Sequence, residues 1–160
     1  MYKKITGKVA LLIMLFSLTV FTGCEENYAY KEGDFVLTVS VAETTLFQGE
    51  KFKVDIAFEN FSDRSHDIDV FFLFTPRIPA WEFIGPVAAE MPQYPSSIFF
   101  AEDSSMQRSE YIDVALQQKP GIYELTYWAD FYLNYGKPNE QHIAISSNVI
   151  ALTVILSNLK

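Results

Sequence analysis

Few residues in this chain are of the types that perform chemistry. Its 160 residues include one cysteine, two histidines and 20 carboxylates. A single cysteine excludes an intramolecular disulfide and a Cys-x-x-Cys zinc site. The sequence has no nucleophile-elbow, zinc-protease, phosphate-loop or dinucleotide-binding motif. We therefore expect a protein that is not an enzyme and has no cofactor, although hydrolysis by a pair of carboxylates stays open.

The two histidines are the candidate metal ligands. His66 and His142 begin two predicted strands that flank a third at 122–133, and this places their Cα atoms about 10 Å apart. A zinc or copper ion between them would recruit Asp67 or Asp130. The alternative is two exposed histidines at strand ends, and we adopt it because isolated histidines make a poor first shell. The sequence therefore predicts no metal site.

An acidic segment supplies oxygens of the kind that calcium prefers. These oxygens belong to Asn60, Asp63, Asp67 and Asp69. Their spacing lacks the glycine-containing loop of the EF-hand. The segment is therefore interpreted as a solvated acidic loop.

The first 24 residues have the layout of a targeting signal. A start with three lysines is followed by an uncharged run, 9–23, and then by the only cysteine, Cys24. A membrane-spanning helix needs about 20 apolar residues, so this run indicates a secretory signal peptide. Val20-Phe21-Thr22-Gly23-Cys24 resembles the bacterial lipobox, with Phe21 where leucine is usual. The resemblance implies that Cys24 is lipidated and becomes the new N-terminus. The alternative is an uncleaved anchor helix, and either places the remainder at the extracytoplasmic face of the cell membrane.

Charge separates the signal from the rest of the chain. Residues 1–23 hold three of the 12 basic residues and no acidic one, so residues 24–160 carry nine basic against 20 acidic residues, a formal charge of −11. Such a chain repels nucleic acid. We assign residues 1–23 to the signal peptide, 24–33 to a tether and 34–160 to one domain.

Hydrophobic periodicity in the domain is that of strands. Apolar residues occupy alternate positions near 35–41, 51–59, 67–75, 111–116 and 122–133. Phe72 and Leu116 are among the positions expected to face inward.

The last predicted strand changes parity along its length. Ile143 and Ile145 are odd-numbered, whereas Ile150, Leu152 and Val154 are even-numbered. One residue must be absorbed between the two sets, which predicts a β-bulge near 146–148.

The predicted fold class is all-β. About seven short strands with turn signals indicate an immunoglobulin-like antiparallel two-sheet sandwich, preceded by an N-terminal signal-peptide helix. Segments 120–125 and 147–154 resemble the closing hairpin of bacterial immunoglobulin-like domains. This resemblance implies a fold and no activity.

A proline-rich excursion interrupts the strands at 76–100. Five of the seven prolines lie between Pro76 and Pro95, together with bulky residues such as Trp81 and Tyr94. Proline cannot donate to a sheet ladder, so the excursion cannot be a central strand. Its bulk predicts an ordered segment that packs on the sandwich.

One outer sheet face is expected to be apolar. It carries Phe71, Leu73, Trp128 and Tyr132 beside several acids. An apolar outer face requires a cover. The excursion is the simplest cover. The alternative is a partner surface, to which Trp81 and Tyr94 would also belong, since exposed Trp and Tyr are typical interface anchors.

Three functions fit these observations. The first is a non-catalytic, membrane-anchored immunoglobulin-like module that binds a protein partner or supports a cell-envelope assembly. The second is an inhibitor of an extracytoplasmic protease or other hydrolase, acting through the proline-rich loop at 77–81. The third is a carbohydrate-binding module that uses Trp128, Tyr132 and Trp81 as stacking platforms.

Overall fold

The computed structural model of the protein describes residues 28–82 and 95–157, and within this part of the chain it contains strands and no helix. The described strands are β1 (Phe35–Val41), β2 (Thr45–Phe47), β3 (Lys51–Asn60), β4 (His66–Val70), β5 (Phe74–Arg77), β6 (Ser96–Phe100), β7 (Ser104–Asp113), β8 (Gly121–Leu133), β9 (Gln141–Ser146) and β10 (Ile150–Ile155).

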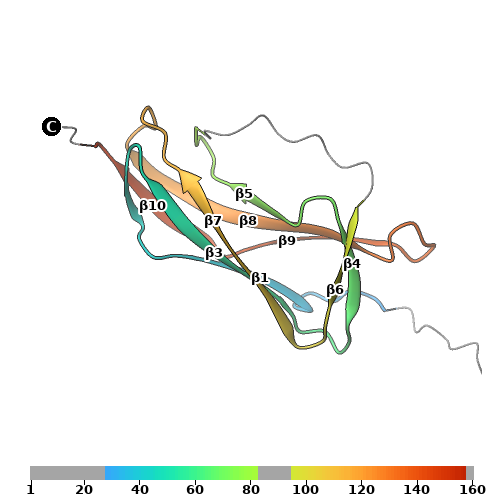
Figure 1. Cartoon of the computed structure of the whole chain (residues 1–160). Helices are drawn as coiled ribbons and strands as arrows, with labels where there is room; N and C mark the ends of the chain where they lie inside the picture. The colour runs from blue at the N-terminus through green and yellow to red at the C-terminus, as the bar shows by residue number, and fades with distance from the viewer. Residues whose placement is uncertain (1–27, 83–94, 158–160) are drawn as a thin grey trace, which may run out of the picture.

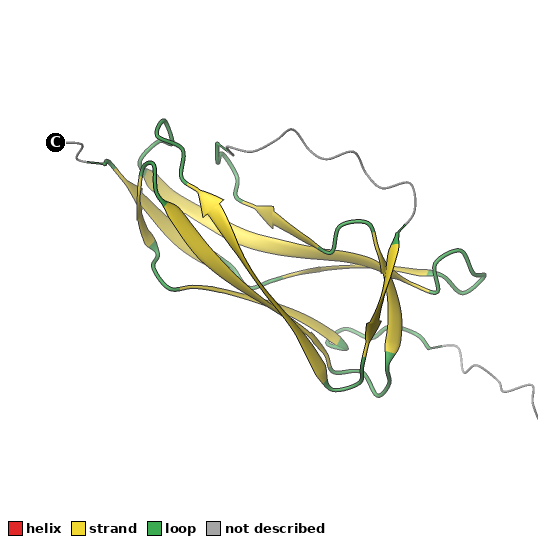
Figure 2. Ribbon diagram, in the orientation of Figure 1, coloured by secondary structure: helices red, strands yellow, loops and turns green. Residues whose placement is uncertain are grey.

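These strands form two sheets, which Figures 1 and 2 show as two layers. The three-stranded sheet has the order β1-β3-β7 and is antiparallel. The seven-stranded sheet has the order β2-β10-β8-β4-β6, with β5 and β9 also paired to β8. Its β2–β10 pair is parallel and its other pairs are antiparallel. The expected all-β two-sheet sandwich is therefore confirmed.

The core lies between the sheets and is built by alternation. In β3 the even-numbered residues from Phe52 to Phe58 are buried, and Lys51, Lys53 and Asp55 face solvent. The aromatic centre joins both layers. Phe58 of β3 packs on Phe100 of β6, with ring centroids 4.9 Å apart, and on Phe131 of β8 at 5.5 Å. Burying each such ring stabilises the fold by about 1.5–3 kcal/mol.

The predicted β-bulge is present between β9 and β10. Trp128 of β8 pairs with Ser146, and Leu125 pairs with Ile150, so the β9–β10 side has one residue more between the two pairs. The Ser147 amide donates to the Tyr127 carbonyl at 2.9 Å, and the Ser147 hydroxyl accepts from the Tyr127 amide at 2.9 Å. The N–H and the carbonyl of Tyr127 are therefore both hydrogen-bonded opposite the bulge.

The structure corrects several details of the predicted strands. Strands β2, β5 and β6 are additions. Strand β6 lies within the proline-rich excursion, and β5 joins the end of the strand predicted at 67–75 to the first two residues of the excursion. Phe72 is 43% exposed and Leu116 is 63% exposed, although both were expected to face inward. The reason is that β4 ends at Val70 and β7 ends at Asp113, so the alternation does not reach them. Pro76 fits in β5 because β5 pairs with β8 on one side only.

Candidate functional site

The outer face of the seven-stranded sheet is built on β8. Odd-numbered residues of β8 from Leu125 to Leu133 are buried, so Glu124, Thr126, Trp128, Asp130 and Tyr132 face outward. Strands β5 and β4 lie along one side of β8, and β10 and β9 along the other. The alternation therefore places the predicted residues Trp128 and Tyr132 on one surface, as expected.

Trp128 forms the floor of a shallow hollow. Its strand neighbours Thr75 and Ser146 are small, and the indole remains 38% exposed. The hollow has a volume of about 300 Å³, at the lower end for small-molecule sites. Arg77 and Glu124 also line it, and neither has an ion-pair partner among the described residues. Trp128 is thus only partly covered, and Arg77 and Pro79 of the excursion lie beside it. Residues 83–94 of the excursion lie outside the described part of the chain.

Phe71 and Tyr132 belong to an aromatic cluster nearer the other end of β8. Tyr135, from the loop after β8, packs edge to face on both, with ring centroids 5.9 Å from Phe71 and 5.3 Å from Tyr132. His142 stacks on Tyr132 at 4.6 Å, and its Nε2 lies 2.7 Å from an Asp130 carboxylate oxygen. The cover of Tyr132 therefore includes the 134–140 loop, which lies outside the proline-rich excursion.

Further exposed apolar side chains continue this face past Trp128. Ile122 is 75% exposed and Val149 is 59% exposed, and Phe47 of β2 is 40% exposed. Ile122 pairs with Thr153 and Phe47 with Ile155, so these strands extend the sheet to its far end. The sequence could have identified Ile122, because Ile122 and Trp128 are both even-numbered residues of β8 and therefore face the same side.

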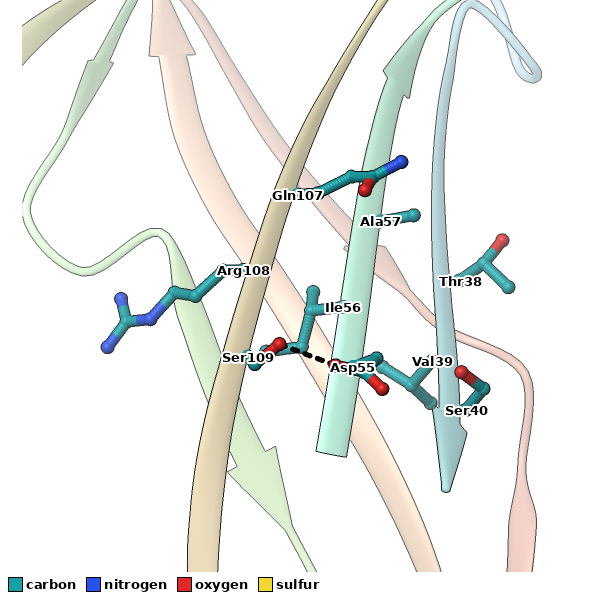
Figure 3. Close-up of a pocket in the computed structure, with 9 residues that line it drawn as sticks. All are labelled: Thr38, Val39, Ser40, Asp55, Ile56, Ala57, Gln107, Arg108 and Ser109. Carbon is teal, nitrogen blue, oxygen red and sulfur yellow. Dashed lines mark hydrogen bonds between the residues drawn. The ribbon is translucent and has the colours of Figure 1, made fainter. Parts of the chain in front are cut away.

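The outer face of the three-stranded sheet is mostly polar, although it also carries the exposed Tyr111. Figure 3 shows Thr38, Ser40, Asp55, Gln107 and Ser109 around a shallow depression on that sheet. Lys53 and Ser109 both hydrogen-bond the Asp55 carboxylate, which lowers the pKa of Asp55. This face is an ordinary solvated one, and the two outer faces differ sharply in character.

Trp81 lies in the core and not on the candidate surface. It is 7% exposed, packs edge to face on Phe52 and Tyr123, and its indole N–H donates to the Asp113 carbonyl at 3.1 Å. The buried Gln118 amide binds the same segment, accepting from the Glu82 amide at 2.8 Å. The role of Trp81 in binding is therefore corrected to a structural one. Tyr94 and Cys24 lie outside the described residues.

The two histidines occupy opposite faces of the sheet. His66 faces inward, and its Nε2 lies 2.8 Å from the Ser62 hydroxyl. Burial, and then the nearby Arg64 charge, lower the pKa of His66. His142 faces outward beside Asp130, so the two imidazoles do not converge on one ion. Within residues 28–82 and 95–157, no group of three or more His, Cys, Asp or Glu side chains is placed to hold a metal.

A second hollow lies at the end of the sandwich where the described chain begins. Residues of the loops at 61–65 and 134–140 line it together with Tyr28, and its volume is about 350 Å³. The two loops thus lie at one end of the sandwich. In the part of the chain described by the structure, no helix is long and apolar enough to cross a membrane.

Comparisons with known proteins give structural likeness only. No protein-family model matches the sequence, and no curated protein matches it at a significant level. Spo0M, a sporulation control protein from Bacillus subtilis, has a TM-score of 0.49 and 14% identity, and the match covers 76% of this chain and 49% of Spo0M. A β-glucosidase from Listeria innocua has a TM-score of 0.39 and 16% identity, over 80% of this chain and 17% of the enzyme. The ASH/PapD-like domain 7 of human CEP192 has a TM-score of 0.37 and 10% identity, over 82% of this chain and 94% of that domain. The chain thus spans about half of Spo0M and a small part of the glucosidase.

Proposed function

We propose that the protein is a lipid-anchored, extracytoplasmic, non-catalytic immunoglobulin-like module that binds a protein partner. Its docking surface is the outer face of the seven-stranded sheet. The apolar run 9–23 followed by Cys24 supports the anchor. The observation that carries the binding role is the contrast between the two outer faces: one is polar apart from Tyr111, and the other has several large exposed apolar side chains.

The apolar face has the composition of an interface. Isolated exposed apolar residues are normal, but several on one sheet face are typical of an interaction site. Trp128 lies between Ile122 at one end and the Phe71–Tyr132 pair at the other. Trp and Tyr are the residues most enriched among those that dominate binding energy. Asp130 adds an acidic group at this face, which favours a partner with positive charge opposite it.

Site-specific photocrosslinking in intact cells tests this assignment. A benzophenone amino acid is placed at position 122 or 128 on the apolar face, or at 111 as the matched control. Tyr111 is 67% exposed and lies on the outer face of the three-stranded sheet, where it pairs with Lys53. We expect a discrete adduct from positions 122 and 128 and none from 111. Adducts of equal yield from all three positions, or from none, contradict the assignment.

Carbohydrate binding is a second candidate, and the hollow at Trp128 favours it. A partly exposed indole with Arg77, Glu124 and Thr126 around it offers a stacking surface beside donors and acceptors. The charges of Arg77 and Glu124 balance, which suits a neutral polyhydroxyl ligand. Affinity electrophoresis through gels containing neutral polysaccharides tests this, with retardation expected for the native protein and lost in Trp128→Ala. Equal mobility of both proteins in every polysaccharide would remove this candidate.

Inhibition of a hydrolase through residues 77–81 receives less support. Ile78 is 4% exposed and Trp81 is 7% exposed, so neither could enter an enzyme cleft without leaving the core. The proline-rich residues 83–94 lie outside the described part of the chain.

A further inference from the structure

The start of the described chain is fastened to one end of the sandwich. The Tyr28 hydroxyl donates to the Asp34 carboxylate, and the Tyr28 ring lies 4.4 Å from the His66 ring, centroid to centroid. The Gln141 amide accepts from the Tyr30 amide at 2.9 Å and donates to the Tyr28 carbonyl at 2.6 Å. Tyr28 and Tyr30 are both partly buried against the core. Residues assigned to the tether from the sequence therefore include some that pack on the domain.

The length of chain between Cys24 and Tyr28 limits how far this end can lie from the anchor. Four Cα steps span at most about 14 Å when fully extended. This limit holds for any conformation of residues 24–27. Given the acylation of Cys24 that the proposed function includes, this end of the domain is held within that distance of the bilayer surface. A long tether would have left the orientation free.

The same end presents side chains suited to a lipid headgroup region. Phe61 is 55% exposed, and its amide donates to the Asp34 carbonyl at 2.7 Å, next to the fastened segment. Tyr135 is 39% exposed on the neighbouring loop, which also carries the exposed Lys137. Aromatic rings with nearby cations are enriched where proteins meet the membrane interface. The two loops carry Asp63, which is ion-paired with Arg64, and Glu140 alongside Lys137. Their charges balance, so this end has no net attraction to anionic headgroups and suits zwitterionic ones.

We propose that the loops at 61–65 and 134–140 rest on a zwitterionic bilayer surface, with Phe61 and Tyr135 in the headgroup region. The proposal deepens the proposed function because it gives the docking surface an orientation. In Figure 1 the blue start of the described chain and the orange loop after β8 lie toward the same side, opposite the C-terminus. Strand β8 is roughly 40 Å long at about 3.3 Å per residue. The apolar face therefore extends away from the membrane, with Ile122 and Phe47 at its far end.

Fluorescence quenching of the acylated, full-length protein tests the orientation. The chain has one cysteine, which the acyl chains occupy, so an added surface cysteine is the only free thiol for a dye. Asp63→Cys and Pro138→Cys place a dye in the two loops and keep both aromatic rings, and Gln117→Cys is the control beyond β7. The labelled proteins are reconstituted into phosphatidylcholine vesicles that contain a nitroxide-headgroup lipid.

We expect quenching at positions 63 and 138 to exceed that at 117 severalfold. Equal quenching at all three positions contradicts the proposed orientation. So does an absence of quenching in protein that floats with the vesicles, and neither result contradicts the anchor. Protein that does not float with the vesicles contradicts the anchor, and the inference fails with it.

Two further variants test separately the contribution of the short link between Cys24 and Tyr28 and that of the Phe61 and Tyr135 rings. Insertion of 12 Gly/Ser residues between Asn27 and Tyr28 adds a reach of about 19 Å. It should lower the quenching at least twofold, and unchanged quenching contradicts the role of the short link. Phe61→Ser combined with Tyr135→Ser should lower it as well, whereas Tyr111→Ser should not. A double variant that quenches like the native protein contradicts the aromatic contact.

Discussion

The two tryptophans occupy opposite environments, although either could have served as a binding anchor on sequence grounds. Trp81 closes the gap between Phe52 and Tyr123 and is 7% exposed. Trp128 lies on the sheet surface among small neighbours and is 38% exposed. The same substitution at the two sites therefore has different consequences.

Thermal melts of Trp81→Ala and Trp128→Ala measure this difference. Trp81→Ala should destabilise the fold by about 3–5 kcal/mol, because it leaves a cavity and an unpaired Asp113 carbonyl. Trp128→Ala should cost about 1 kcal/mol or less, as partly exposed side chains do. The expected Tm loss is about 10 °C for the first variant and a few degrees for the second. A larger loss in Trp128→Ala than in Trp81→Ala contradicts both assignments.

His66 makes stability depend on pH. It is inward-facing and packed against Tyr28 and Phe35, and burial is the main cause of its lowered pKa. The folded state therefore binds a proton less readily than the unfolded chain, whose histidine titrates near 6.5. The resulting stability is fully present above pH 6.5 and is lost as the pH falls through the lower, folded pKa.

Urea unfolding of the native protein should accordingly show a lower midpoint at pH 5.5 than at pH 7.5. His66→Gln should reduce the difference between the two pH values, since it removes the titrating group. His142→Gln, at the exposed histidine beside Asp130, is the control and should retain the difference. If the difference in midpoint between the two pH values is unchanged in His66→Gln, the pH dependence arises from other groups.

Side-chain amides replace missing strand partners at several element ends. The Asn148 amide accepts from the Val39 N–H at 2.9 Å and donates to the Val39 carbonyl at 3.0 Å, which ties β1 to the bulge in the other sheet. Gln141 does the same for residues 28–30, and Gln118 for residues 80–82. Each amide places a donor group and an acceptor group side by side, as a strand backbone does.

Asn148→Ala should therefore loosen the join between the sheets. Two lost hydrogen bonds correspond to about 1–3 kcal/mol of unfolding free energy. Hydrogen exchange of the Val39 amide should accelerate more than that of its neighbours in β1. Val149→Ala, one residue further along, is the control and should leave Val39 unaffected. Unchanged protection of Val39 in Asn148→Ala would show that the amide contributes nothing to this join.

Hydrophobic periodicity made the long strands predictable, but it could not reveal the short ones. Strands β3 and β8 alternate over 10 and 13 residues, and the parity change at Ile150 located the bulge. Strand β2 has three residues and β5 has four with a proline, which is too short for a period to appear. Strand β6 combines two serines with two phenylalanines, and its pairing with β4 depends on tertiary contacts.

Residues of the candidate site were predictable only where they lie in a regularly alternating strand, because there the odd and even positions face opposite sides of the sheet. Trp128 and Tyr132 were placed on the outer face correctly, because β8 alternates without interruption. Trp81 and Tyr135 lie in connections, where side-chain direction depends on turns and partners that no period encodes. The residues that line the hollow at Trp128 come from β5 and the turn after it, from β8, and from the bulge, so only the strand pairing brings them together.

At the scale of the whole molecule, the proposed function makes the location of the protein depend on an anchor at Cys24. Cys24→Ser should abolish acyl labelling and move the protein from the detergent-extracted membrane fraction to the soluble one. The reason is that two acyl chains give stable membrane attachment, and the acidic remainder has no electrostatic attraction to anionic lipid. Fractionation with a radiolabelled fatty acid measures both effects. Acyl label that persists in Cys24→Ser would rule out this residue as the acceptor.

The parallel pairing of β2 with β10 also sets the order in which the fold can close. Thr45 pairs with Thr153, more than a hundred residues later, and β2 has no other strand partner among the described residues. Contacts between such distant segments form late, because the chain entropy lost in closing the loop comes before the contact forms. The early strands therefore cannot complete the seven-stranded sheet until the C-terminal strand is available. The proposed function requires export of the chain through a translocation channel. This delay would keep the sheet incomplete, and the polypeptide able to pass through the channel, until the last strand has crossed.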